Sequence, residues 1–184
     1  MDAAGRVFAR RGYTTATVQD VADELGILKG SLYYYIDSKE ELLFRLMIQL
    51  HDEVDELLVQ VAELETETTP LNRLRAYVER QLDWNLRNLV RVRVYYDDLD
   101  LLSREHRAQM VERRRAHQSF VANMIREAQA DGRATATVDP ELLTNLVFAP
   151  LIWPYQWYRR GGSIAADKVI QGCADFFFAG CRSV

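Results

Sequence analysis

The sequence predicts an all-α protein, and three observations support that class. Apolar residues recur every three to four positions through most of the 184-residue chain, as helices with one buried face require. Residues that cap helices stand at segment ends, such as Thr17, Gly26 and the pair Asp139-Pro140. No alternating strand pattern or hairpin turn interrupts them. We therefore expect about nine helices, three small ones at the N-terminus and the rest in a larger C-terminal bundle.

The N-terminal helices are predicted at residues 2–11, 18–25 and 29–34. Gly12 and Gly26 end the first two of them. The second has its buried stripe at Val18, Val21, Ala22 and Leu25. Ser38 with Glu41 forms a capping box that begins a long helix reaching about residue 63. This pattern predicts a first domain over residues 1–45 and a second over residues 46–184.

The second domain is predicted to hold the long helix and five further helices. These cover residues 71–89, 92–99, 103–130, 140–160 and 163–181. Pro150 and Pro154 fall inside the helix at 140–160, where they remove backbone donors and favour a kink.

Composition excludes several classes of protein. The net charge is −4 and 48% of residues are hydrophobic, which fits a globular chain with a core. No run of 18 apolar residues predicts a membrane span, and the first residues lack the apolar segment of a signal peptide. Cys173 and Cys181 lie too far apart on one helix for a disulfide, so we expect reduced thiols and a cytoplasmic location.

Nothing in the sequence predicts catalysis. The three histidines, His51, His106 and His117, have neither metal-ligand nor catalytic-triad spacing. No phosphate loop or nucleophile motif appears. We therefore expect no enzyme activity, no metal site and no cofactor.

Residues 15–43 have the form of a helix-turn-helix, which places its second helix in the major groove of DNA. Lys29, Gly30 and Ser31 begin that helix with one cation, one residue that permits close approach and one hydroxyl. Leu32 is expected to pack inward. The other expected DNA contacts are the capping hydroxyl of Thr17 and the ammonium of Lys39. Tyr33 and Tyr34 are expected to supply a hydroxyl for phosphate contact and a ring for packing.

This stretch resembles the DNA-binding domain of the TetR family of bacterial regulators. The matching residues are Phe8, Gly12, Thr15, Thr17, Val18, Val21, Ala22, Gly26, Gly30, Ser31, Leu32, Tyr33, Lys39, Glu40 and Leu42. Where the family often has His-Phe after its tyrosine, this chain has Tyr34, Tyr35 and Ile36, with Ile36 in the apolar position. The resemblance implies a homodimer on a palindromic operator of double-stranded DNA. It also implies repression that a small-molecule effector relieves from the C-terminal bundle.

Aromatic residues of the second domain are the candidates for an effector site. They are Trp84, Tyr95, Tyr96, Phe148, Trp153 and Trp157. A plain core or a dimer interface is the alternative for residues 153–158, and at least one of the three phenylalanines at 176–178 should meet another subunit. Residues 157–162 resemble the W-Y-x-x-G-G segment of TetR relatives that sense acyl-coenzyme A thioesters.

Arginines near this segment, between Arg87 and Arg115, fit either an anion-binding rim or ordinary solvated helix faces. The effector is therefore expected to be an acyl-coenzyme A thioester or a hydrophobic aromatic metabolite. The function that the sequence predicts is a repressor of the TetR type. The alternatives are a DNA-binding adaptor with this fold and an activator built from the same parts.

Overall fold

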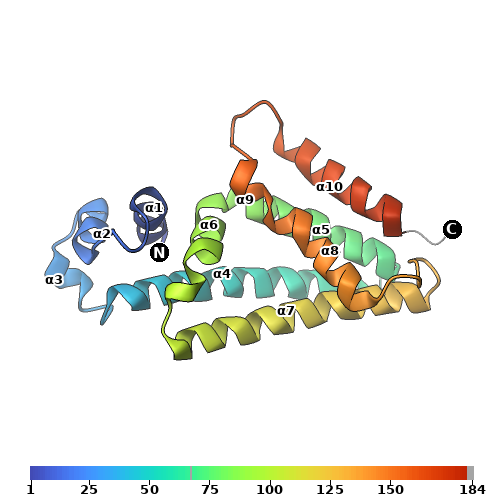
Figure 1. The fold of residues 1–184 in the computed structure, drawn as a ribbon, viewed down its shortest axis with the longest axis horizontal. Helices are drawn as coiled ribbons and strands as arrows, with labels where there is room; N and C mark the ends of the chain where they lie inside the picture. Colours follow the sequence, from blue (N-terminus) through green and yellow to red (C-terminus); the bar gives the residue numbers. More distant parts are fainter. Residues whose placement is uncertain (67, 182–184) are drawn as a thin grey trace. The chain divides into compact units, whose positions relative to one another are not determined.

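The computed structural model describes residues 1–66 and 68–181, and it confirms the all-α class (Figure 1). These residues contain no β-strand. The helices are α1 (Asp2–Arg11), α2 (Val18–Leu25), α3 (Lys29–Leu32), α4 (Lys39–Ala62), α5 (Pro70–Arg87), α6 (Leu89–Asp98), α7 (Arg104–Ala130), α8 (Pro140–Ile152), α9 (Pro154–Trp157) and α10 (Ala166–Cys181). Short 3₁₀ turns follow α4 and α6 at Glu63–Thr66 and Leu99–Leu101. No helix within the described residues is both long and apolar enough to cross a membrane.

The chain forms two compact units, and each takes segments from two parts of the sequence. Unit 1 contains Met1–Asp52 and Asn88–Arg113. Unit 2 contains Glu53–Arg87 and the chain from Arg114 onward. Helices α4 and α7 each contribute residues to both units. The division at residue 45 that the sequence suggests stays a prediction about function.

Unit 1 is built around the apolar faces of its helices. Helix α1 packs against α2 and α6, and Val7 and Phe8 are almost completely buried. Gly5 permits the close approach of α1, because a Cβ there would lie 3.1 Å from the Leu46 Cδ1 atom. Leu43 and Leu46 bury the start of α4 in the same core. Burial of each such side chain stabilises the folded chain by about 1.5–3 kcal/mol.

In unit 2, helix α5 packs against α8 and α10 (Figure 1). Leu74, Leu82 and Leu151 are the large aliphatic side chains that these helices bury most completely. Cys173 and Cys181 are free thiols, and burial raises the pKa of Cys181 to about 11.

The prediction of a single helix over residues 140–160 is wrong, because the structure has two helices there, α8 and α9. Asp139 caps α8, accepting hydrogen bonds from the N–H groups of Glu141 and Leu142 at 3.0 and 3.1 Å. Pro150 lies inside α8 without ending it. The helix ends at Ile152, just before Pro154, which begins α9. Because proline lacks an N–H and its ring crowds the preceding turn, Pro154 is the residue that separates the two helices.

Candidate DNA-binding face and effector-binding unit

Local hydrogen bonds shape the helix-turn-helix of unit 1. Thr17 caps α2 as predicted, since its hydroxyl accepts from the Asp20 N–H at 3.1 Å. The Asp20 carboxylate accepts from the Thr17 N–H at 2.8 Å and completes a capping box. Gly26 ends α2 in the left-handed conformation, with φ 68°. The caps at the two ends of α2 fix the direction in which the chain enters α3. This second helix of the motif is the recognition helix, which is expected to lie in the major groove.

Helix α3 presents a polar, exposed surface. Lys29 and Gly30 are exposed and Ser31 is partly exposed, while Tyr34 is 90% exposed. Leu32 and Ile36 are buried, as the sequence indicates. The Lys29 ammonium lies 5.8 Å from the centre of the Tyr33 ring. This surface has the cation, hydroxyl and small residue that contacts with phosphates and base edges require.

The recognition helix is shorter than the predicted range of 29–34. The Tyr34 N–H bonds to the Ser31 carbonyl at 3.3 Å, and the Tyr35 N–H bonds to the Leu32 carbonyl at 3.0 Å. These bonds reach three residues back, so the chain tightens after Leu32. The tight turn buries Ile36 and leaves Tyr34 and Tyr35 outside.

Leu28 is a surface residue that sequence reasoning missed. It lies at the N-cap position of α3 and is 79% exposed. An apolar side chain beside Lys29 suits contact with a thymine methyl group. Its position in the sequence could have identified it, since Leu28 directly precedes the residues expected to enter the groove.

Lys39 is held within unit 1 by its ammonium group. The Lys39 Nζ atom donates to the carbonyl oxygens of Tyr13, Ala16 and Thr14 at 2.8, 2.9 and 3.2 Å. It also lies 4.4 Å from the centre of the Tyr13 ring. An ammonium has three donors, so these carbonyls match its capacity. Lys39 therefore stabilises the loop between α1 and α2, a role that competes with the phosphate contact expected from the sequence.

Two of the three acidic residues of α2 are paired with arginines of α1. Glu24 binds Arg6 at 2.9 Å and Arg10 at 3.1 Å, and Asp20 lies 3.2 Å from Arg11. The hydrogen bond from Arg6 lowers the pKa of Glu24 below its usual value. The backbone N–H of Thr17 does the same for the pKa of Asp20. The pairing offsets the negative charge of α2 next to the DNA-binding face.

The six candidate effector residues are divided between the two units. Tyr95 and Tyr96 belong to unit 1, where the Tyr95 hydroxyl lies 3.1 Å from His51 Nε2. Trp84, Phe148, Trp153 and Trp157 belong to unit 2. Phe148 packs edge-on against His117, with ring centres 5.2 Å apart, and His117 Nε2 lies 2.9 Å from the Tyr77 hydroxyl. Their joint role in one effector site stays a prediction.

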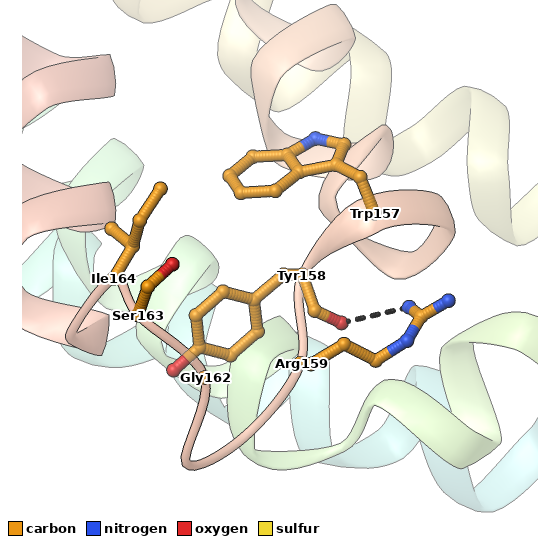
Figure 2. A pocket seen from close by; sticks show the side chains of 6 residues that line it. All are labelled: Trp157, Tyr158, Arg159, Gly162, Ser163 and Ile164. Carbon is orange, nitrogen blue, oxygen red and sulfur yellow. Dashed lines mark hydrogen bonds between the residues drawn. The ribbon is translucent and has the colours of Figure 1, made fainter.

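A small surface pocket follows α9 (Figure 2). Its volume is about 180 Å³, and it is lined by Trp157, Tyr158, Arg159, Gly162, Ser163 and Ile164. The Arg159 guanidinium donates to the Tyr158 carbonyl at 3.0 Å instead of pointing into the pocket. Pockets for drug-sized ligands measure about 300–1,000 Å³, so this one suits only part of such a molecule.

At least four of the eight arginines that suggested an anion-binding rim are engaged by carboxylates. The ion pairs are Arg87 with Asp83, Arg93 with Asp97, Arg107 with Asp100 and Arg113 with Asp52. Two of them join residues four apart on one helix. These pairs favour the interpretation as ordinary helix faces.

Helices α8 and α10 carry exposed apolar side chains. Leu142, Leu146 and Trp153 are spaced along one side of α8, and Trp153 is 63% exposed. On α10, Phe176 is 85% exposed. We call these four residues the outer apolar face of unit 2. Exposed apolar side chains on two helices of the same unit make this face a candidate interaction site.

Two family models match the chain. Residues 1–46 match "Bacterial regulatory proteins, tetR family", and residues 67–181 match "Tetracyclin repressor-like, C-terminal domain". Among curated proteins, the chain is similar to the HTH-type transcriptional repressor KstR2 of Mycolicibacterium smegmatis. The two are 31% identical over 170 residues, which cover 91% of this chain and 82% of that protein.

Solved structures share the fold. The ketosteroid transcriptional regulator KstR2 of Mycobacterium tuberculosis matches with a TM-score of 0.90 at 24% identity, covering 100% of this chain and 93% of that one. AibR in complex with isovaleryl coenzyme A and operator DNA matches with a TM-score of 0.85 at 24% identity, covering 96% and 94%. The family models and the similarity to the repressor KstR2 establish that the chain belongs to the TetR family of helix-turn-helix transcriptional regulators.

Proposed function

We propose that the chain is a cytoplasmic, homodimeric repressor that binds a palindromic operator and leaves it when a hydrophobic small molecule binds in unit 2. The observation that carries the proposal is the surface of a capped helix-turn-helix, where Lys29 and Ser31 lie on α3 and exposed Tyr34 lies in the turn after it. The similarity to a protein named as a repressor supports the sign of regulation.

The outer apolar face is the proposed dimer interface. Phe176 is surrounded on its side of α10 by small residues, among them Gly172, Cys173 and Gly180. A Cβ added at Gly172 or Gly180 would meet no atom within 4 Å, so that side of α10 is open. Small residues let a partner helix approach closely, and burial of Leu146 and Phe176 against a second copy would remove their apolar surface from water.

Two classes of effector fit the proposal. An acyl-coenzyme A thioester is one, because the same fold in AibR holds isovaleryl coenzyme A together with operator DNA. A hydrophobic aromatic metabolite is the other. The ring contacts among Tyr77, His117 and Phe148 supply aromatic surroundings in unit 2 that suit the apolar part of an effector of either class.

Helix α4 is the proposed connection between effector and DNA. It begins at Lys39, directly after the recognition segment, and continues into unit 2 as far as Ala62. A shift of this helix changes the separation of the two recognition helices, so both half-sites cannot be engaged together. A coupling free energy of about 1–3 kcal/mol is enough for such a switch.

Footprinting on the DNA upstream of the gene tests the function. We expect protection of one palindromic site whose half-sites lie about one helical turn apart. Leu146→Glu should give a monomer in sedimentation experiments and lose the footprint, whereas Asn145→Asp, at an exposed polar neighbour, should retain both dimer and footprint. Protection of many unrelated sites, or a full footprint from a monomeric variant, would contradict the proposal.

A further inference from the structure

Helix α5 carries a buried row of polar side chains. Tyr77, Gln81 and Asn85 stand four residues apart, so they share one face of the helix. Their exposed fractions are 0%, 4% and 8%. Polar groups buried so deeply are normally hydrogen-bonded, so the partner of each atom is informative.

Asn85, the last residue of this row on α5, bonds to the C-terminal end of α8. The last carbonyls of a helix lose their helical partners, and here the Asn85 Nδ2 atom donates to the carbonyl oxygen of Leu151 at 2.8 Å. Leu151 lies within α8, two residues before Trp153. One side chain of α5 therefore holds the end of the helix that carries most of the outer apolar face.

The Leu151 carbonyl fixes the direction of the hydrogen bonds along the row. A carbonyl oxygen only accepts, so Asn85 turns its nitrogen to Leu151 and its Oδ1 atom to Gln81. Gln81 Nε2 donates to that Oδ1 atom at 3.0 Å. Reversing either amide would set two donors or two acceptors against each other. The atom left at the far end of the row is therefore Gln81 Oε1, which is an acceptor.

Gln81 Oε1 is buried and accepts no hydrogen bond from the protein within residues 1–66 and 68–181. Because this atom can only accept, whatever satisfies it must bring an O–H or N–H group. One turn away on α5, the Tyr77 ring packs edge-on against His117, with centres 5.7 Å apart. The acceptor thus lies on the same helix face as a buried aromatic ring.

We propose that Gln81 Oε1 is the hydrogen-bond acceptor of the effector site, and that the effector is an apolar or aromatic molecule bearing a hydroxyl or N–H donor. This inference rests on the proposed function, which places an effector in unit 2, and adds the chemical group that the site selects. A donor on Gln81 Oε1 strengthens the bonds from Gln81 to Asn85 and from Asn85 to Leu151. The row thereby links the effector to the end of α8.

Two matched pairs of probes test the proposal on the full chain. They are 2-naphthol with 2-methylnaphthalene, and cyclohexanol with methylcyclohexane, which differ by a hydroxyl in place of a methyl group. Apolar burial alone favours the methyl member, so a preference for the hydroxyl reports a hydrogen bond. We expect calorimetry to show about tenfold tighter binding of a hydroxyl member, the value for one ordinary hydrogen bond.

Gln81→Met removes the Oε1 acceptor, together with the Nε2 donor to Asn85, at similar volume and is expected to abolish the preference. Gln60→Met makes the same change at an exposed position and should keep it. If Gln81→Met does not fold, the unmodified chain still tests the proposal, because its affinities for the hydroxyl and methyl probes of each pair are compared directly. Equal binding within both pairs, which leaves water as the donor, would overturn the proposal. So would binding of neither hydroxyl probe, or a Gln81→Met chain that keeps the preference.

Operator binding without any probe is measured alongside as a separate readout. Its absence in the unmodified chain would contradict the proposed function. A chain that binds its operator but shows no hydroxyl preference contradicts only the role of Gln81.

Discussion

Lys39→Met separates two roles for a residue that the sequence assigns to DNA. The substitution keeps the aliphatic stem and removes three hydrogen bonds to the carbonyls of Tyr13, Thr14 and Ala16. At the lower value for hydrogen bonds to charged groups, each contributes about 1.5 kcal/mol. The ring contact adds about 0.5 kcal/mol, and ordering a lysine side chain costs about 2 kcal/mol. The brace is therefore expected to stabilise the folded chain by roughly 3 kcal/mol.

Thermal unfolding followed by circular dichroism measures this effect. A loss of roughly 3 kcal/mol lowers the Tm of a chain of this size by about 6–12 °C. The salt dependence of DNA binding supplies the second readout, because each phosphate contact contributes a slope of about one unit. We expect Lys39→Met to lower the Tm and leave the slope nearly unchanged.

Lys29→Met is the matched control, since Lys29 is exposed on α3. It should leave the Tm unchanged and reduce the salt slope by about one unit. The reasoning is refuted if Lys39→Met unfolds at the same temperature as the unmodified chain and loses one unit of slope. That result would assign Lys39 to the phosphates.

Three further predictions concern both units. Thr17→Ala removes the cap of α2 and should lower the free energy of unfolding by about 1 kcal/mol, measured by urea denaturation, whereas no change would show that the Asp20 box does not hold the helix. The pKa of Glu24 is lowered in the folded chain, so its contribution is complete above the ordinary carboxyl pKa and is lost as the pH falls through the lower folded value. Glu24→Gln should therefore flatten the loss of stability below about pH 4, and identical pH curves would count against the Arg6 pairing. Asn85→Leu leaves the Leu151 carbonyl without its donor and should cost about 1–3 kcal/mol by the same denaturation assay, while a neutral effect would mean that this bond does not hold the end of α8.

Much of the fold could be predicted because the information is local. Thr17, Gly26 and Asp139 act within a few residues of themselves, and each ends or begins a helix where the sequence places it. The apolar stripe of α2 predicts its buried face for the same reason, since Val18, Val21 and Ala22 are buried. Such signals depend on backbone chemistry that does not need the rest of the chain.

The contacts that the sequence does not predict join residues that lie far apart in the chain. Lys39 looks like a solvated cation until the carbonyls of residues 13–16 are placed around it. Glu24 looks like a negative charge near DNA until Arg6 and Arg10 pair with it. The periodicity of α5 shows an amphipathic helix, but the hydrogen bond from Asn85 to Leu151 spans 66 positions and has no local signal.

Operator affinity with and without a bound effector tests the central claim most directly. Octanoyl-coenzyme A and 2-naphthol stand for the two proposed classes, and calorimetry first identifies which of them the chain binds. Fluorescence anisotropy then measures the affinity for the footprinted operator at saturating probe, with free coenzyme A and 2-methylnaphthalene as controls. The account predicts that the bound probe weakens operator binding about 5–150-fold. An operator affinity that stays the same with the probe bound would contradict it.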